Sequence, residues 1–433
     1  MRYLLNLAYL ALIVLASPLL LRRAVAHGKY RQGWRQKLFG FVPRREGDAP
    51  CLWFHAVSVG EVNLLAPLLA ELARRQPRWQ CVLSTTTITG LATAQKKYPA
   101  LTVFYCPLDF TWAVRTALRR IRPSCLVLAE LELWPNLIAA ARRSGARVAV
   151  VNGRLSERSF QGYRRLRWLI GPSLKRLDLV AVQNDDYAER FLTLGAEPQA
   201  VHVTGSMKFD GAQTDRHNAA TERLRKVAGF EDGDTVFLAG STQEGEEKAA
   251  LAAYRQLCQE FPRLRLIIVP RHPQRFESVA ELLDRSRLDW QRRSRLEAEG
   301  ARSSARILLV DTIGELGAWW GTASIAFVGG SLGSRGGQNM IEPAAYGAAV
   351  SFGPNTRNFR DIVEQMLCDR AAVVVADEDE LTAFVRRCLV DDRYTENLGQ
   401  RARRLVFSQL GATQRTCDLL CPLVEPSFRA RAA

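Results

Sequence analysis

The chain has 433 residues, which is too long for one hydrophobic core and fits two domains of about 200 residues each. Its 47% hydrophobic and 24% charged residues are ordinary for a globular protein. The formal net charge is +16, of which residues 1–45 contribute +9, so the rest of the chain carries only +7 (16 − 9). Because more than half of the net positive charge lies in residues 1–45, a nucleic-acid-binding function is disfavoured and contact with a membrane surface is favoured.

The first feature along the chain is a 19-residue apolar run over residues 3–21, broken only by Asn6, Ser17 and Pro18. That length just spans a bilayer core of about 30 Å. An A-x-A triplet at 24–26 is consistent with a cleaved signal peptide, but two arginines separate it from the run. This order is typical of a retained anchor. We therefore predict a membrane anchor over residues 1–23, with the basic segment and all that follows on the cytoplasmic side.

Residues 24–49 form the basic juxtamembrane segment, in which Trp34 and Phe39 to Phe41 stand among the cations and are expected in the headgroup layer. The nine cysteines are scattered, no C-x-x-C pair occurs, and most lie in apolar strand-like runs. Cys417 and Cys421 are one helical turn apart with no histidine nearby, so no metal site is expected there. The cysteine pattern suits a reducing cytosol.

From residue 50 onward, short apolar runs alternate with amphipathic stretches, which predicts parallel α/β sheets. In the first half, strands are expected near 51–56, 80–85, 101–105, 125–129, 147–151 and 178–182, with helices at 61–75, 88–97, 111–121, 134–143 and 185–194. After the polar segment 211–218, strands are expected near 235–239, 264–269, 305–310, 324–328, 348–352 and 372–375, and one or two helices over 394–421. The prediction is two doubly wound domains, 50–210 and 211–425, with a cleft between them and ligands at the carboxyl ends of the strands.

The first strand ends in W-F-H-A-V-S-V-G-E, which places Glu61 in the first turn of the following helix. A carboxylate there either complements the helix dipole or acts as a general base.

The fourth strand runs into A-E-L-E-L-W-P-N, where Glu130 and Glu132 would share one face of an extended chain. A metal pair is disfavoured because no histidine or third carboxylate lies close in sequence. Lys208, in V-T-G-S-M-K-F-D, is either solvated or neutralises a leaving phosphate.

The second half carries three further motifs at strand ends. L-I-I-V-P-R-H-P ends a buried strand with Arg271 and His272, and an arginine there suits a phosphate. D-T-I-G-E puts Gly314 at a strand-to-helix turn. The apolar run 325–328 is followed by a loop that contains Gly329, Gly330, Gly333, Gly336 and Gly337. A helix is expected to begin after this loop, near Asn339. The loop is either a phosphate site or a glycine-rich turn closed by a capping box of Asn339 and Glu342.

Taken together, these blocks resemble the 3-deoxy-D-manno-octulosonic acid (Kdo) transferases of lipopolysaccharide assembly, and the resemblance covers nearly the whole chain. It is carried by H-A-V-S-V-G-E, E-L-E-L-W-P-N, N-G-R-L-S-E-R-S, V-T-G-S-M-K-F-D, S-T-Q-E-G-E-E, V-P-R-H-P and G-G-S-L-G-S-R-G-G-Q-N. The resemblance implies a glycosyltransferase-B fold, CMP-Kdo as donor, a lipid A precursor as acceptor, no metal or other cofactor, and a place at the cell inner membrane.

The same resemblance implies residue roles. Glu61 corresponds to the proton acceptor, and Glu130 and Lys208 correspond to transition-state stabilisers. The implied CMP-binding residues are Pro270, Arg271, Ile313, Gly314, Glu315, Asn339, Met340, Ile341 and Glu342. Gln243 and Gln338 stand where the family commonly has histidine, and Met340 with Ile341 replaces a common Pro-Leu pair.

Two other functions are consistent with parts of the sequence. One is a related two-domain transferase that uses a UDP-sugar, against which the H-A-V-S-V-G-E turn and the Lys208 motif argue. The other is a membrane-tethered binding protein, for which the basic N-terminus alone would carry function. A basic tail does not explain so many motifs at strand ends.

Overall fold

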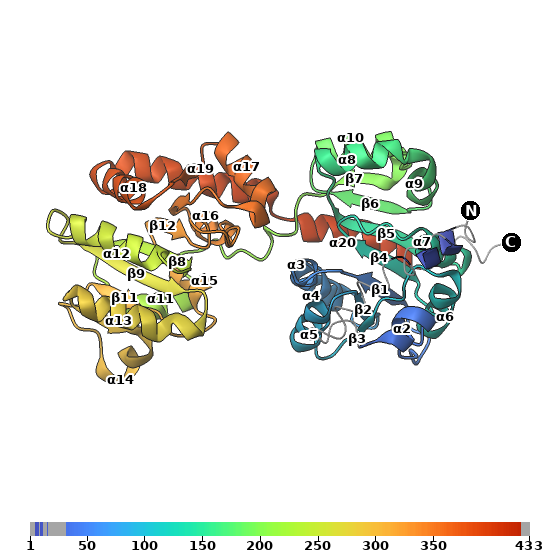
Figure 1. Ribbon diagram of the computed structural model, residues 1–433, viewed down its shortest axis with the longest axis horizontal. Coiled ribbons are helices and arrows are strands. Elements are labelled where there is room, and N and C mark those ends of the chain that lie inside the picture. Colours follow the sequence, from blue (N-terminus) through green and yellow to red (C-terminus); the bar gives the residue numbers. More distant parts are fainter. Residues whose placement is uncertain (1–4, 8, 12–14, 16–31, 426–433) are drawn as a thin grey trace. The chain divides into compact units, whose positions relative to one another are not determined.

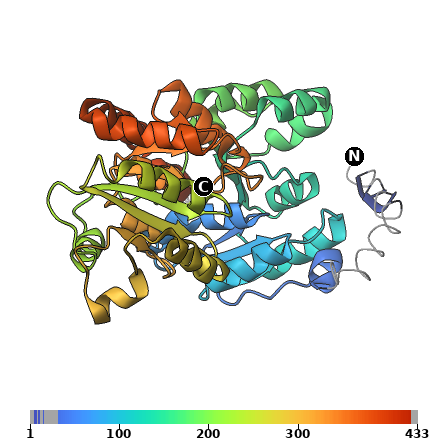
Figure 2. The ribbon, with the colours of Figure 1, turned by 60° about the vertical axis from the view of Figure 1, so that its left-hand side comes forward.

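The computed structural model describes residues 5–7, 9–11, 15 and 32–425 (Figure 1). The chain divides into two compact units, Met1–Gly211 with Gln409–Ala433, and Ala212–Ser408. Each unit contains one seven-stranded sheet whose strands all pair in parallel. Helices cover both faces of each sheet (Figures 1 and 2). Because both faces are covered, the strands are near-continuous apolar runs and do not alternate with polar residues.

The first sheet has the order β3-β2-β1-β4-β5-β6-β7. Apolar clusters on its two faces form the core of this unit. Its strands are β1 (Cys51–His55), β2 (Gln80–Thr85), β3 (Thr102–Tyr105), β4 (Cys125–Ala129), β5 (Arg147–Gly153), β6 (Leu179–Val182) and β7 (Val201–Val203). Its helices are α2 (Trp34–Phe39), α3 (Val59–Leu64), α4 (Ala66–Arg75), α5 (Ile88–Lys97), α6 (Thr111–Ile121), α7 (Pro135–Arg143), α8 (Glu157–Arg165), α9 (Arg167–Leu174), α10 (Asp185–Leu194) and α20 (Ala412–Val424).

The second sheet has the order β10-β11-β9-β8-β12-β13-β14. Its strands are β8 (Thr235–Thr242), β9 (Leu264–Pro270), β10 (Trp290–Arg292), β11 (Ile307–Leu309), β12 (Ile325–Val328), β13 (Ala349–Phe352) and β14 (Val373–Val374). Its helices are α11 (Ala219–Val227), α12 (Glu246–Leu257), α13 (Phe276–Ser286), α14 (Leu296–Glu299), α15 (Leu316–Trp320), α16 (Ile341–Ala345), α17 (Arg360–Cys368), α18 (Glu378–Val390) and α19 (Asp392–Gln409).

The division of the chain differs from the expected 50–210 and 211–425 at its C-terminal end. After α19 the chain returns to the first unit, where α20 packs against α4, β5 and β6 (Figure 1). Cys417 and Leu420 are fully buried in the first unit's core, and the N–H groups of Gly411 and Thr413 both donate to the Asp210 carboxylate. The apolar stripe of α20 shows that the helix needs a partner but does not say which unit supplies it.

The secondary structure mostly follows the sequence pattern, and the differences have local causes. Helices α5, α6 and α10 have the expected bounds, whereas the helix expected over 61–75 is split into α3 and α4 by Pro67, which cannot continue a helix. Helices α8 and α9 were not anticipated. Helix α8 has no fully buried residue, and only Phe160 and Tyr163 pack against the core, so its apolar stripe is narrow. The three-residue strands β7 and β10 were also missed because they are too short for a periodic signal.

The anchor predicted over residues 1–23 lies mostly outside the described residues, and so does the triplet at 24–26. Among the residues described, no helix is long and apolar enough to cross a membrane. Two described residues of the run have polar contacts with the first unit, since Asn6 hydrogen-bonds with Thr111 and the Tyr9 hydroxyl donates to Asp109. The anchor therefore remains a prediction.

Candidate active site

Three parts of the predicted site, Glu61, Glu130 and the glycine-rich loop, lie at the places where the strand order of each sheet reverses. In the first sheet the order reverses between β1 and β4, and Glu61 and Glu130 follow these two strands. In the second sheet it reverses between β8 and β12, and the glycine-rich loop follows β12. In open parallel sheets, ligands bind beyond the carboxyl ends of the strands at such switch points.

The Glu61 carboxylate is held in a fixed orientation by the turn between β1 and α3. Ser58 is the N-cap of α3, and its Oγ accepts the Glu61 N–H at 3.3 Å. In return the Ser58 hydroxyl donates to Glu61 Oε1 at 2.7 Å, and the Val57 N–H donates to Oε2 at 2.8 Å. This arrangement is a capping box in which the carboxylate reaches one residue further back than usual. Each carboxylate oxygen still has a lone pair for another donor.

The electrostatic environment of Glu61 favours a carboxyl that takes up protons. Burial raises the pKa of the Glu61 carboxyl, the hydrogen bonds from Ser58 and Val57 lower it, and the nearby charge of Glu130 raises it, with a net rise. A general base works best when its pKa approaches the working pH. The capping role and the general-base role, which the sequence left as alternatives, are therefore compatible in this geometry.

Glu130 and Lys208 form an ion pair, with Nζ 3.7 Å from Oε1 and both side chains about one-quarter exposed. Glu130 has φ +56°, a left-handed conformation that is unusual for a residue with a side chain. The Glu130 N–H donates to the Val151 carbonyl at 3.0 Å, which holds this conformation. Non-glycine residues in this region cluster at functional sites, because surrounding contacts must stabilise them.

Asn152, at the end of β5, fixes the segment that carries Lys208. This residue is fully buried with φ +53°, and its Oδ1 accepts the Met207 N–H at 2.9 Å. Asn152 belongs to the N-G-R-L-S-E-R-S motif, which contributed to the family resemblance without receiving a role. The signal for its role was the asparagine-glycine pair at a strand end, where asparagine tolerates the left-handed region.

Glu132 completes a group of three carboxylates but does not share a strand face with Glu130. Strand β4 ends at Ala129 and the chain then turns, so the expectation based on an extended chain was wrong. The Trp134 indole N–H donates to Glu132 Oε2 at 3.0 Å. Burial, together with the charge of Glu61, raises the pKa of Glu132 to about 7. The structure therefore brings Glu61, Glu130, Glu132 and Lys208 into one electrostatic group.

In the second unit, the glycine-rich loop after β12 does not offer its first N–H groups to a ligand. The N–H groups of Gly330, Ser331 and Leu332 all donate to the Glu246 carboxylate, at 2.7 to 2.9 Å. The helix beyond the loop, α16, has only five residues and begins at Ile341 with Met340 as N-cap, not at Asn339. The expectation of a phosphate site at the start of this loop needs correction, because the Glu246 carboxylate already accepts the N–H groups of Gly330, Ser331 and Leu332.

The predicted capping box of Asn339 and Glu342 occurs in altered form. Asn339 Oδ1 accepts the Ile341 N–H at 3.1 Å, and Asn339 Nδ2 donates to Glu342 Oε1 at 2.9 Å. Burial raises the pKa of Glu342, whereas the Asn339 hydrogen bond and the charge of Arg271 lower it. Arg271, which is exposed, therefore lies within electrostatic reach of the loop end. Met340 and Ile341 are buried, so any part they take in donor binding is through their backbone.

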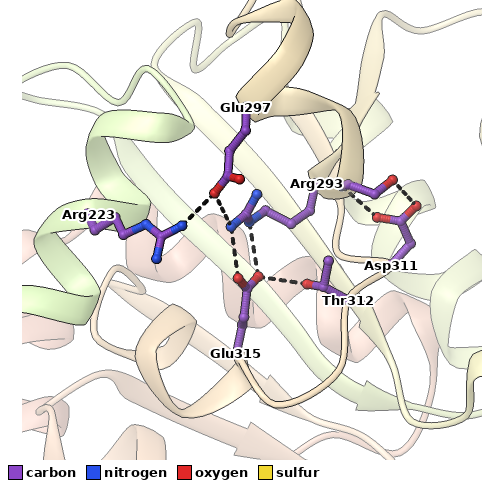
Figure 3. Close-up of polar contacts among 7 residues, drawn as sticks. Arg223, Arg293, Glu297, Asp311, Thr312 and Glu315 are labelled. Atoms are coloured by element: carbon purple, nitrogen blue, oxygen red, sulfur yellow. Dashed lines mark hydrogen bonds and ion pairs between the residues drawn. The ribbon is translucent and has the colours of Figure 1, made fainter.

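The third predicted donor segment, residues 313–315, combines an exposed turn with an ion pair between the partly exposed Glu315 and the buried Arg293 (Figure 3). Ile313 is 80% exposed, and Gly314 has φ +92°. By contrast, the Glu315 carboxylate accepts two hydrogen bonds from Arg293, at 2.8 and 3.0 Å, and one from the Thr312 hydroxyl at 2.6 Å. Glu315 thus fixes the base of the turn, and Ile313 and Gly314 are the parts that a ligand can reach.

The fold defines the class of protein. The UDP-GlcNAc 2-epimerase from Neisseria meningitidis shares the fold at a TM-score of 0.55 and 13% identity, covering 87% of this chain and all of that one. A glycosyltransferase from Rickettsia africae also shares it, at a TM-score of 0.51 and 11% identity, covering 88% of this chain and all of that one. The architecture is therefore a glycosyltransferase-B-like α/β fold, with one parallel sheet in each unit.

Sequence comparison gives the family. The family model for "3-Deoxy-D-manno-octulosonic-acid transferase (kdotransferase)" matches residues 32–211. The 3-deoxy-D-manno-octulosonic acid transferase of Bordetella pertussis is 35% identical over 401 residues, 88% of this chain and 91% of that protein. The transferase of the same name from Haemophilus influenzae is 31% identical over 428 residues, 96% of this chain and 98% of that protein. This chain belongs to the Kdo transferase family and is a glycosyltransferase.

Proposed function

We propose that this protein transfers Kdo from CMP-Kdo to a tetraacyl lipid A precursor (lipid IVA) in lipopolysaccharide core biosynthesis, with inversion at the anomeric carbon. The observation that carries the proposal is the fixed, partly buried Glu61 carboxylate at the β1–β4 switch point, beside the Glu130–Lys208 pair, in a chain of this family. The curated relatives are named for Kdo transfer, and the motifs at these positions are those of the family resemblance.

In this mechanism Glu61 is the general base. Its carboxylate takes the proton of the acceptor hydroxyl as the acceptor oxygen forms a bond to the anomeric carbon of Kdo. The bond from that carbon to the phosphate oxygen of CMP breaks, and its electron pair leaves with CMP. Attack opposite the departing CMP inverts the configuration. The raised pKa of Glu61 supports proton transfer near neutral pH.

Cationic side chains of the protein stabilise the negative charge that develops on the departing phosphate. Lys208 and Arg271 are the candidates, and Arg271 can bind two oxygens with its planar guanidinium. The backbone of Ile313 and Gly314 and the loop end from Asn339 to Glu342 are the proposed contacts for the nucleotide.

We also propose that the first unit binds the inner membrane through its N-terminal part. Helix α2 packs on α6, where the N–H of the Trp112 indole donates to the Leu38 carbonyl. Trp34, Phe39 and Phe41 are each about half exposed on this side. A groove of about 910 Å³ along α6 and α7 is lined by four arginines and, among the described residues that form it, no carboxylate: Arg115, Arg119, Arg122 and Arg143. Exposed aromatic rings beside arginines suit an anionic headgroup layer.

The proposal is tested by supplying CMP-Kdo, generated in situ, with a tetraacyl lipid A precursor in detergent and reading the product by mass spectrometry. Wild type and Glu61→Ala are compared, with EDTA present. Added Kdo with wild type alone supports the donor, the acceptor and the role of Glu61, and the mass counts the sugars transferred. No product from folded wild type would refute the donor and acceptor assignment, and a panel of UDP-sugars would then be tried.

A further inference from the structure

We propose that Glu246 and Glu247 are positioning residues for the donor, each fixing one of the loops that carry the proposed CMP contacts. They are consecutive residues in the first turn of α12, next to the second unit's switch point between β8 and β12. Both side chains are about 1% exposed. The inference rests on the proposed function for the identity of the donor, but the contacts that carry it are independent of that identity.

Glu246 binds the start of the glycine-rich loop. Its Oε2 accepts the N–H groups of Gly330 at 2.7 Å and Gln243 at 2.8 Å, and its Oε1 accepts those of Ser331 and Leu332 at 2.8 and 2.9 Å. Four backbone donors around one carboxylate form an arrangement like those that hold phosphates in proteins. Here the anion is a side chain of the protein itself.

The loop is built to let this carboxylate approach. A Cβ on Gly329 would lie 2.7 Å from Glu246 Oε2 and 2.6 Å from the Thr242 Cα, so only glycine fits. Gly330 has φ +69°, and its carbonyl accepts the Gly337 N–H at 2.7 Å. This bond links the segment held by Glu246 to the loop end at Asn339. The position of the proposed nucleotide contacts therefore depends on Glu246.

Glu247 acts on the loop after β9 in the same way. Its carboxylate accepts two hydrogen bonds from Arg275, at 3.0 and 3.2 Å, and one from the Thr242 hydroxyl at 3.1 Å. The Thr242 carbonyl in turn accepts the Arg271 N–H at 3.0 Å. The backbone of Arg271, the proposed phosphate ligand, is thus held by Thr242, whose hydroxyl donates to Glu247, and Glu247 also pairs with Arg275 four residues further along the same loop.

These contacts explain why the charges at the start of α12 are buried. Acidic residues in a first helical turn usually complement the helix dipole from the surface. A buried carboxylate is costly unless hydrogen bonds or an opposite charge compensate it, and both carboxylates are compensated by donors from the loops. Because the first N–H groups of the glycine-rich loop point to Glu246, the donor phosphate must rely on Arg271 and on backbone beyond Leu332.

The first experiment compares Glu246→Gln, Glu247→Gln and the control Glu244→Gln. Glutamine keeps the volume of Glu246 but offers one acceptor oxygen and an NH2 group, so two of the four N–H groups lose their acceptor. Glu244 lies two residues before α12 begins and is 93% exposed, with a 4.0 Å contact to Arg275. We expect the first two variants to raise the KM for CMP-Kdo about 10- to 100-fold and leave the acceptor KM within about twofold. Glu244→Gln should change neither.

The second experiment measures amide hydrogen exchange in peptides that cover 329–340 and 271–276. Glu246→Gln should speed exchange in the first peptide and Glu247→Gln in the second. In wild type, the Gly330, Ser331 and Leu332 amides should be protected already without nucleotide, and added CMP should not change their exchange. This wild-type measurement tests whether Glu246 holds the loop without nucleotide, even if a variant fails to fold.

Unchanged donor KM and unchanged exchange in folded Glu246→Gln would overturn the inference. So would amides at 330–332 that become protected only when CMP is added, because they would then be ligand contacts. If kcat fell in Glu246→Gln or Glu247→Gln while the KM values for donor and acceptor stayed unchanged, the two glutamates would have a merely structural role and would not position the donor. Absence of turnover in wild type would count against the proposed function alone, since the exchange measurements test the loop contacts without it.

Discussion

Replacing Glu61 with glutamine separates its proposed catalytic role from its structural one. An amide can keep both contacts of the carboxylate, because its oxygen can accept the Val57 N–H while its NH2 group donates to Ser58 Oγ. The Ser58 oxygen would still accept the residue 61 N–H that caps α3. The turn should therefore survive the substitution, and only the ability to accept a proton is lost.

The expected size of the effect follows from this difference. Loss of a general base costs about 10²–10⁴ in rate. Loss of an N-cap costs about 0.5–2 kcal/mol, which Glu61→Gln avoids because Ser58 remains. Unfolding temperature should thus stay within about 2–4 °C of wild type, while kcat falls by at least two orders of magnitude.

Ser58→Ala is the matched variant, since it perturbs the same turn and keeps the base. It should lower stability by the cost of the cap. It also removes a hydrogen bond that lowers the pKa of Glu61, so the pKa rises further. A base must be deprotonated to act, so the acidic limb of the profile of kcat/KM against pH should move to higher pH in Ser58→Ala.

The assay is transfer from CMP-Kdo to the detergent-solubilised lipid A precursor between pH 5 and 9, with melting curves recorded alongside. Glu61→Gln with wild-type rates would refute the assignment of the base. An acidic limb that stays in place in Ser58→Ala would show that the titrating group is not Glu61. A large loss of stability in Glu61→Gln would show that the turn does not accept the amide as reasoned.

Four further predictions test the remaining parts of the proposal. Lys208→Met should lower kcat by about 10²–10³ with little change in unfolding temperature, because the 3.7 Å pair with a carboxylate is partly exposed; equal kcat would exclude Lys208 from charge stabilisation. Arg271→Lys should raise the KM for CMP-Kdo about tenfold by losing the two-pronged contact with phosphate, and an unchanged KM would exclude that contact. Burial raises the pKa of Glu132 to about 7 from 4.5, so its contribution to stability is present below pH 4.5 and is lost as the pH rises to 7. Glu132→Gln should therefore melt at a higher temperature than wild type at pH 8, with a smaller difference at pH 4. A difference in melting temperature that does not depend on pH would contradict this. Reversing Arg115 and Arg119 together to glutamate should weaken binding to phosphatidylglycerol vesicles by about 2–4 kcal/mol while sparing turnover in detergent, and unchanged sedimentation with vesicles would exclude the groove as the contact.

Much of the fold could be predicted from the sequence because parallel strands buried on both faces leave continuous apolar runs. The strands β1, β2 and β4 and the helices α5, α6 and α10 follow these runs and their caps closely. The order of motifs also placed Glu61, Glu130 and the glycine-rich loop at strand ends. Helix α8, in which only Phe160 and Tyr163 pack against the core, carries a much weaker apolar pattern and was missed.

The candidate site was likewise only partly predictable from the sequence. Their residue types and their positions at strand ends identified Glu61, Lys208 and Arg271 as candidate catalytic or phosphate-binding residues. The sequence could not show that Glu130 turns back to pair with Lys208, because that depends on a left-handed residue whose conformation the neighbouring strand stabilises. It also could not show that the N–H groups of residues 330–332, at the start of the glycine-rich loop, already donate to Glu246.

The sequence by itself therefore determined the family, the two α/β sheets and the chemical type of each site residue, because these depend on local pattern and residue identity. The tertiary structure alone decided which groups meet. Contacts such as Glu246 with Gly330, or α20 with the first unit's core, join residues 84 or more positions apart along the chain. Their formation depends on the three-dimensional path of the whole chain, which no local pattern encodes.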